Sequence, residues 1–180
     1  MSGPAPATAT QDNPAPVLLR RRRIAAAFAG SGELAAAVDG FTPRAAQQEM
    51  ALAVFDTIVE RGTLIAEAGT GTGKTFAYLV PALLAGGKVL ISTGTKTLQD
   101  QVYAKDLGTL IRALGLSVDA ALLKGRQNYL CLQRLARAEA EGRLPSRQDA
   151  EHLRAIGRFA RLTATGDRAE LAEVPESAQI

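Results

Sequence analysis

The chain has 180 residues, of which 47% are apolar and 22% charged, and its formal net charge is +3. This composition predicts a globular protein with one main core and excludes a largely disordered chain, while the slight basic excess permits nucleic-acid binding without requiring it. The single cysteine excludes an intrachain disulfide, and no apolar run is long enough to span a membrane, so we expect a cytoplasmic protein without a membrane partner.

The N-terminal region is poor in bulky apolar residues. Residues 1–17 consist mainly of Pro, Ala and Thr, and we expect a disordered tail because such a segment buries little surface. The basic run Arg20–Arg23 precedes the apolar residues 24–28, which predict a short helix. The four arginines have two interpretations, an arm that contacts phosphates or a solvated helix face.

The middle of the chain alternates between two apolar patterns. Apolar residues at helical spacing predict helices over 44–60, 74–84 and 97–114, with Pro81 inside the second. Short apolar runs predict buried strands over 63–66, 88–92 and 118–123. Strands that alternate with helices are typical of an α/β fold, in which helices cover a parallel sheet.

The pattern changes after Gly125. Residues 131–165 are expected to be helical, divided into two helices near Pro145-Ser146, and no strand is predicted. The one histidine, His152, falls in the second helix, where a surface position is expected. Residues 166–180 show no clear pattern. We therefore expect residues 126–180 to belong to a different unit.

A glycine-rich loop carries the strongest chemical signal. It follows a predicted strand and opens a predicted helix, as a phosphate-binding loop requires. Glycines allow successive backbone N–H groups to face a phosphate chain, and the helix N-terminus favours anions. We expect Lys74 to reach the β- and γ-phosphates of ATP and Thr75 to hold Mg²⁺. The residues expected to bind ATP here are Ala68, Gly69, Thr70, Gly71, Thr72, Gly73, Lys74 and Thr75.

Groups that ATP hydrolysis needs are missing from the pattern. No apolar run after the loop ends in the acidic residue that holds the metal ion, and Asp119 starts its predicted strand rather than ending it. A small P-loop kinase would need a lid and an acceptor site, which we do not find. A stand-alone ATP-binding adaptor module is the other alternative. The three-strand sheet would expose apolar edges, so we interpret the chain as part of a longer protein.

Three further stretches, together with Glu67–Thr75, give the chain its resemblance to a known family. They are Phe41–Met50, Ser92–Gln101 and Lys124–Cys131. The set resembles the bacterial DinG/YoaA group of superfamily 2 DNA helicases, relatives of the XPD-type helicases that carry an iron–sulfur cluster. The YoaA-like branch is the most similar. The similarity runs from about Phe41 to about Leu135, and four motifs in order are more specific than a phosphate loop alone.

The resemblance implies roles for further residues. Gln47 matches a glutamine that recognises adenine, a role its amide can fill because it both donates and accepts hydrogen bonds; a polar residue on an exposed helix face is the alternative. Thr93, Thr95 and Lys96 match a motif that contacts the backbone of single-stranded DNA. An ordinary helix N-cap would look the same, so both interpretations stay open for these three residues.

Cys131 matches the first of the cysteines that hold a [4Fe–4S] cluster in this family; a small buried residue is the alternative. The other ligands, an Asp-Glu-x-His element and a second motor domain would lie beyond Ile180. The chain would then be an N-terminal portion that binds ATP weakly and neither hydrolyses it well nor unwinds DNA by itself.

The resemblance also implies an architecture for the protein. Residues 18–125 would be the N-terminal part of a RecA-like ATP-binding domain, and residues 126–180 would begin an iron–sulfur domain. The implied activity is ATP-dependent 5′→3′ unwinding on single-stranded or forked DNA during repair or replication. Replication or repair proteins are the implied partners, and the full-length protein is expected to be a monomer.

Overall fold

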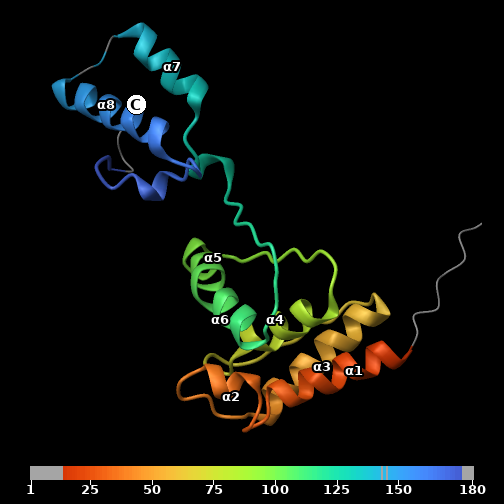
Figure 1. Ribbon diagram of the computed structural model, residues 1–180. Coiled ribbons are helices and arrows are strands. Elements are labelled where there is room, and N and C mark those ends of the chain that lie inside the picture. Colours follow the sequence, from red (N-terminus) through yellow and green to blue (C-terminus); the bar gives the residue numbers. More distant parts are fainter. Residues whose placement is uncertain (1–13, 143, 145, 176–180) are drawn as a thin grey trace, which may run out of the picture. The chain divides into compact units, whose positions relative to one another are not determined.

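The computed structural model describes residues 14–142, 144 and 146–175, and the chain forms two compact units, Met1–Ala120 and Ala121–Ile180. The first unit contains six helices among its described residues, α1 to α6, with a π-helical segment between α5 and α6, and the second contains α7 and α8 (Figure 1). None of the helices in the described part is long and apolar enough to cross a membrane.

The first unit is built around a core of packed helices. Helix α3 (Ala45–Glu60) packs against α4 (Lys74–Ala85), and α1 (Pro14–Ala27) lies along both. The short helix α2 (Glu33–Ala37) contacts α6 (Gly108–Ala113). The largest fully buried side chains of this core are Ile24, Phe28, Leu34, Phe55, Leu79, Val80, Pro81 and Leu110.

The helices expected over 44–60 and 74–84 are confirmed, and the first ends for a local reason. Arg61 adopts a left-handed conformation with φ 54°, and its N–H donates to the carbonyl groups of Thr57 and Ile58. Gly62 also donates its N–H to the Thr57 carbonyl. The sequence predicts that the helix stops at Gly62. It ends one residue earlier, because Arg61 in its left-handed conformation is the C-cap.

The helix expected over 97–114 is continuous but not uniformly α-helical. It consists of α5 (Lys96–Gln101), the π-helix η1 (Val102–Leu107) and α6. Val102, Asp106 and Leu110 are all buried, so an acidic residue lies between two apolar ones on the inner side of the helix. A π-helical segment inside an α-helix is often found near a functional site.

The disordered tail was expected over residues 1–17. Its first thirteen residues lie outside the described part of the chain, whereas residues 14–17 form the first turn of α1. Two of the four arginines that follow are engaged within the unit. Arg21 donates to both carboxylate oxygens of Asp56, and Arg23 donates to Glu33 and to the Leu114 carbonyl. For Arg21 and Arg23, the structure therefore shows ion pairs that link α1 to other helices of the first unit.

The three expected strands do not form a sheet in the described residues. Residues 63–66, 88–92 and 118–123 carry no helix or strand assignment. Their apolar side chains are largely exposed, with Ile65 95%, Leu90 94% and Leu123 81% accessible. An apolar run becomes a strand only when a neighbour satisfies its backbone groups, and these segments have no such ladder in the described part of the chain.

The second unit is a helical pair closed by a loop. Helices α7 (Leu132–Glu141) and α8 (Arg147–Leu162) pack together, as expected for 131–165. Short 3₁₀ turns lie at Arg126–Asn128 (η2) and Arg168–Glu170 (η3). Ser146 caps α8 by accepting from the Asp149 N–H, whereas Pro145 lies outside the described residues. His152 is half-buried rather than on the surface, and its Nδ1 is buried without a hydrogen-bond partner in the described structure.

Candidate nucleotide-binding site

The glycine-rich loop leads directly into α4. Gly71 has a φ of 75° and Gly73 a φ of 80°, and Gly73 is the N-cap residue of α4. Both values fall in the left-handed region, where a Cβ atom costs about 1–2 kcal/mol, so glycine is the residue that fits these two positions. The loop therefore places the N-terminus of a long helix at its centre, as an anion site requires.

Lys74 lies at the first position of α4 and extends back over the loop. Its Nζ donates to the carbonyl oxygen of Ala68 at 2.7 Å and to that of Gly69 at 2.6 Å. The hydroxyl of Thr72 donates to the same Gly69 carbonyl at 2.9 Å. The ammonium group is thus held inside the curve of the loop, where a phosphate group would also lie.

Two side chains at the start of α3 donate hydrogen bonds to carbonyl groups of the phosphate loop. Gln47 is only 6% exposed, and its Nε2 donates to the Gly73 carbonyl at 2.9 Å. Arg44 donates through Nη1 to the Gly71 carbonyl. The structure therefore brings Gln47 and the phosphate loop together, and the exposed helix face considered as the alternative for Gln47 is wrong. Arg44 was not singled out in the sequence, although it lies one helical turn before Gln47.

A hollow of about 300 Å³ opens between α3, α4 and the segment before the loop. This volume is at the lower end of the range for small-molecule sites. Its lining is mainly apolar, with Gln47, Glu49, Glu67, Thr72 and Lys74 as the polar members, and with the apolar residues Ala46, Met50, Ala53, Leu64, Ala66, Ala68 and Ala77.

Tyr78 extends the site along α4. Long side chains in a helix point toward its N-terminus, so the phenol of Tyr78 reaches back over the turn that begins with Thr75. Burial raises the pKa of the Tyr78 phenol, the hydrogen bond with the Thr75 side chain opposes this increase, and the charge of Asp106 adds to it. The sequence pattern did not reveal Tyr78, although its spacing of three residues from Thr75 could have suggested a contact.

Thr93, Thr95 and Lys96 lie together at the start of α5. Thr95 is the N-cap residue, and its hydroxyl accepts from the Leu98 N–H at 3.2 Å. Thr93 donates to the Thr95 carbonyl at 3.2 Å, and Lys96 is exposed. The structure thus shows the cap geometry, and it leaves a hydroxyl and an ammonium group on the surface where a phosphate backbone could reach them.

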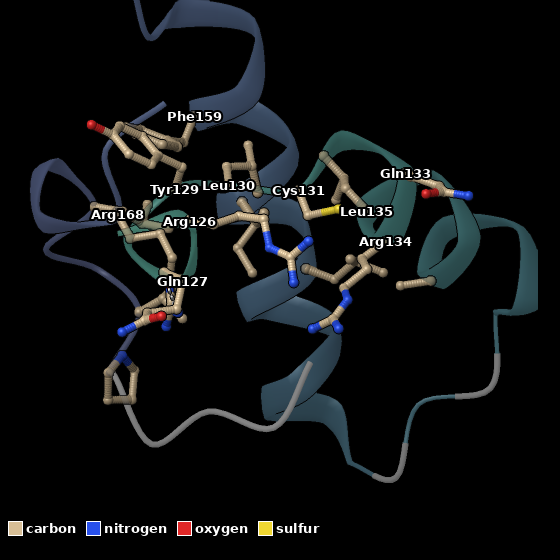
Figure 2. Close-up of a pocket in the computed structure, with 16 residues that line it drawn as sticks. Arg126, Gln127, Tyr129, Leu130, Cys131, Gln133, Arg134, Leu135, Phe159 and Arg168 are labelled. Atoms are coloured by element: carbon tan, nitrogen blue, oxygen red, sulfur yellow. Dashed lines mark hydrogen bonds between the residues drawn. The ribbon is translucent and has the colours of Figure 1, made fainter. Parts of the chain in front are cut away.

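Cys131 lies in the second unit, at the N-cap position of α7, and is a free, exposed thiol. The small buried residue considered as its alternative is therefore wrong. It borders a hollow of about 790 Å³ between α7, α8 and the segment that follows α8. In Figure 2 the side chains of Arg126 and Arg134 extend toward the middle of this hollow.

An iron–sulfur cluster needs about four thiolates. The sequence has one cysteine, and the described residues contain no group of three or more His, Cys, Asp or Glu side chains that could hold a metal ion. By themselves these residues do not fit a cluster.

The segment before Cys131 is fixed by contacts with the segment after α8. Lys124 and Asp167 form an ion pair at 2.8 Å, with side chains only 6% and 13% exposed. The Tyr129 hydroxyl accepts from the Lys124 N–H at 2.8 Å, and Tyr129 forms an antiparallel bridge with Asp167. Leu130 donates to the Gly166 carbonyl at 2.8 Å. These contacts close a loop of about forty residues around α7 and α8 and set the position of Cys131 at its base.

Comparison with known proteins relates this site to a family. Residues 46–154 match the family of DEAD/DEAH box helicases. The chain is 48% identical to the ATP-dependent DNA helicase YoaA of Haemophilus influenzae over 158 residues, which cover 88% of the chain and 25% of that relative. It is 50% identical to YoaA of Escherichia coli over 153 residues, 84% of the chain and 24% of the relative. It is 37% identical to the ATP-dependent helicase DinG of Mycobacterium tuberculosis over 159 residues, 77% of the chain and 24% of the relative. The chain thus spans about a quarter of the length of these relatives. No solved structure matches it.

Proposed function

The chain belongs to the DEAD/DEAH box helicase family, and we propose that it binds Mg·ATP for an ATP-dependent DNA helicase. The relatives with 48% and 50% identity carry that activity in their names. The observation that carries the proposal is the convergence of Lys74, Gln47 and the glycine-rich loop on one hollow at the N-terminus of α4.

On ATP binding, phosphate oxygens would replace backbone carbonyl oxygens as the hydrogen-bond acceptors of the Lys74 ammonium group. Its ammonium group now donates to two neutral carbonyl groups, those of Ala68 and Gly69. Hydrogen bonds to a charged phosphate oxygen are stronger than bonds to a neutral carbonyl, so ATP would draw Lys74 from the loop to the β- and γ-phosphates. The N–H groups at the start of α4 would then face the same phosphates.

Thr75 would bind the metal ion, and Gln47 would recognise the adenine base. The Thr75 hydroxyl oxygen is a hard donor of the kind that Mg²⁺ prefers, and the ion when bound neutralises phosphate charge. The apolar lining next to Gln47 suits the face of an adenine ring. In this assignment Gln47 lies between the adenine and phosphate parts of the site. Its amide would recognise the adenine, and its Nε2 already donates to the Gly73 carbonyl in the phosphate loop.

The family implies a RecA-like fold. Within it, we assign residues 63–66, 88–92 and 118–123 to a parallel sheet, supported by their apolar runs and by the exposure of Ile65 and Leu90. A strand buried on both faces reads as a continuous apolar run, as these do. The phosphate loop would then follow a strand and precede a helix, as in other P-loop proteins.

DNA would be the second substrate of the whole protein, with 5′→3′ unwinding. Thr93, Thr95 and Lys96 are our candidates for contacts with its phosphate backbone, supported by the exposed positions of Thr95 and Lys96 at the start of α5 and by the half-buried Thr93 just before them. We also propose Cys131 as one cluster ligand, supported by its exposed thiol. The 180 residues contain no second cysteine, so other thiolate ligands of a cluster would come from outside them.

Titration with a fluorescent ATP analogue, mant-ATP, tests the nucleotide assignment. We expect Mg²⁺-dependent binding to the chain and a loss of at least about tenfold in Lys74→Met, because a charge-assisted contact contributes about 1.5–3 kcal/mol. Lys88→Met is the matched control, since Lys88 is exposed and lies outside the hollow. Equal affinity for the unsubstituted chain and Lys74→Met would contradict the proposal.

A further inference from the structure

Arg44 contacts the phosphate loop from outside the nucleotide hollow. It is the N-cap residue of α3, and its backbone carbonyl accepts the N–H groups of Gln47 and Gln48 in the first turn. From this fixed position its Nη1 donates to the carbonyl of Gly71, 27 residues along the chain. The residues that line the hollow include neither Arg44 nor Gly71. The guanidinium group therefore acts on the loop rather than on the interior of the hollow.

The next residue in the loop, Thr72, lines the hollow. Its N–H belongs to the same peptide unit as the Gly71 carbonyl, and in a planar trans peptide these two groups point in opposite directions. The hydrogen bond to the carbonyl therefore directs the Thr72 N–H away from Arg44. No hydrogen bond within the described part of the chain uses this N–H as a donor. It is thus available to a ligand.

We propose that Arg44 is a positioning residue, which orients this peptide unit so that the Thr72 N–H binds the phosphate chain common to nucleoside di- and triphosphates. This inference rests on the proposed function of the same site. Backbone N–H groups of a phosphate loop contact the α- and β-phosphates, which ADP and ATP share. A charged donor on the Gly71 carbonyl also polarises the peptide unit, and this strengthens its N–H as a donor.

The backbone at Gly71 needs such a contact, because packing around it is absent. Gly71 has a φ of 75°, and a Cβ atom added there would meet nothing within 4 Å. A glycine has more backbone freedom than any other residue, and open space leaves that freedom unrestricted. Among the described residues, the guanidinium group of Arg44 is the donor to the Gly71 carbonyl. Loss of this donor should let the peptide unit rotate and turn the Thr72 N–H out of position.

The first test compares mant-ATP and mant-ADP binding to the full 180-residue chain. Arg44→Met removes the donor and keeps most of the side-chain length. We expect the affinity for both nucleotides to fall by the same factor, about threefold to tenfold, the range for one lost hydrogen bond. Arg44→Lys keeps a charged donor and should recover part of the loss. Arg22→Met is the matched control, because Arg22 is exposed on α1, lies outside the hollow and carries the same charge.

NMR spectroscopy of the nucleotide-free chain separates positioning from a direct contact with phosphate. The chemical shift of an amide nitrogen responds to hydrogen bonding at the carbonyl of the same peptide unit. Arg44→Met should therefore move the Thr72 resonance before nucleotide is added, and Arg22→Met should not. An unchanged Thr72 resonance, or a loss of affinity confined to mant-ATP, would overturn the inference. Equal affinities of Arg44→Met and Arg22→Met, while Lys74→Met binds weakly, would also overturn it. Failure of the proposed function is distinct, because in that case Lys74→Met would bind mant-ATP as well as the unsubstituted chain does.

Discussion

The contact between Gln47 and Gly73 gives the sharpest test of the site geometry. A Cβ atom at Gly73 would lie 2.1 Å from Gln47 Nε2 and 2.9 Å from its Cδ, so Gly73→Ala must displace the buried amide. The left-handed conformation costs about 1–2 kcal/mol for alanine, and a buried amide without its partner costs about 1–3 kcal/mol. We therefore expect Gly73→Ala to destabilise the first unit by about 2–5 kcal/mol.

Gly71→Ala is the matched control for this prediction. Gly71 has a similar φ of 75°, but a Cβ atom there meets nothing within 4 Å. Its cost should be the conformational strain alone, about 1–2 kcal/mol. Hydrogen exchange at increasing urea concentration, measured on peptides from α3 and α4, gives both values. Equal destabilisation by the two substitutions would refute the reasoning, as would strict additivity of Gly73→Ala and Gln47→Ala.

Three further predictions concern other parts of the chain. Lys124→Met should destabilise the second unit by about 3 kcal/mol, because it removes the cation that pairs with the poorly exposed Asp167 carboxylate, and hydrogen exchange in α7 and α8 should speed up accordingly; an unchanged exchange rate would argue against the ion pair. Burial raises the pKa of Tyr78 above its ordinary value of about 10, so the folded state retains the proton more tightly, and stability should decline as pH rises from about 10 through the raised pKa. Chemical denaturation at several alkaline pH values should show a shallower decline for Tyr78→Phe, and identical curves would exclude this contribution. Thr95→Ala should cost about 1 kcal/mol of helix stability and speed exchange of the Leu98 amide, whereas Thr95→Ser should retain the cap; an unaffected Leu98 amide would contradict the cap.

The helices could be predicted from the sequence because their signals are local. Met50, Val54 and Ile58 repeat every fourth residue, and the structure places them in α3 as expected. The phosphate loop could be predicted for the same reason, because glycine is needed where φ is positive and Lys74-Thr75 begins the helix. Such features depend on residues that are close in the chain.

Contacts between distant residues could not be predicted in the same way. Gln47 and Gly73 are 26 residues apart, and only the packing of α3 on α4 brings the amide to the Gly73 carbonyl. The burial of Asp106 was not predicted, because it depends on the π-helical segment, which the spacing of the apolar residues did not indicate. The expected strands are unpaired in the described residues for a similar reason. The run around Leu90 has strand composition, but a ladder requires a neighbour that the local sequence does not specify.

The central claim is that ATP binds at the loop from Ala68 to Thr75. Hydrogen exchange of the chain with and without Mg·ATP tests it most directly. We predict slower exchange at the amides of the loop and of the first turn of α4, together with protection at the start of α3 around Gln47. Slower exchange confined to other segments, or no change at saturating Mg·ATP, would contradict the account.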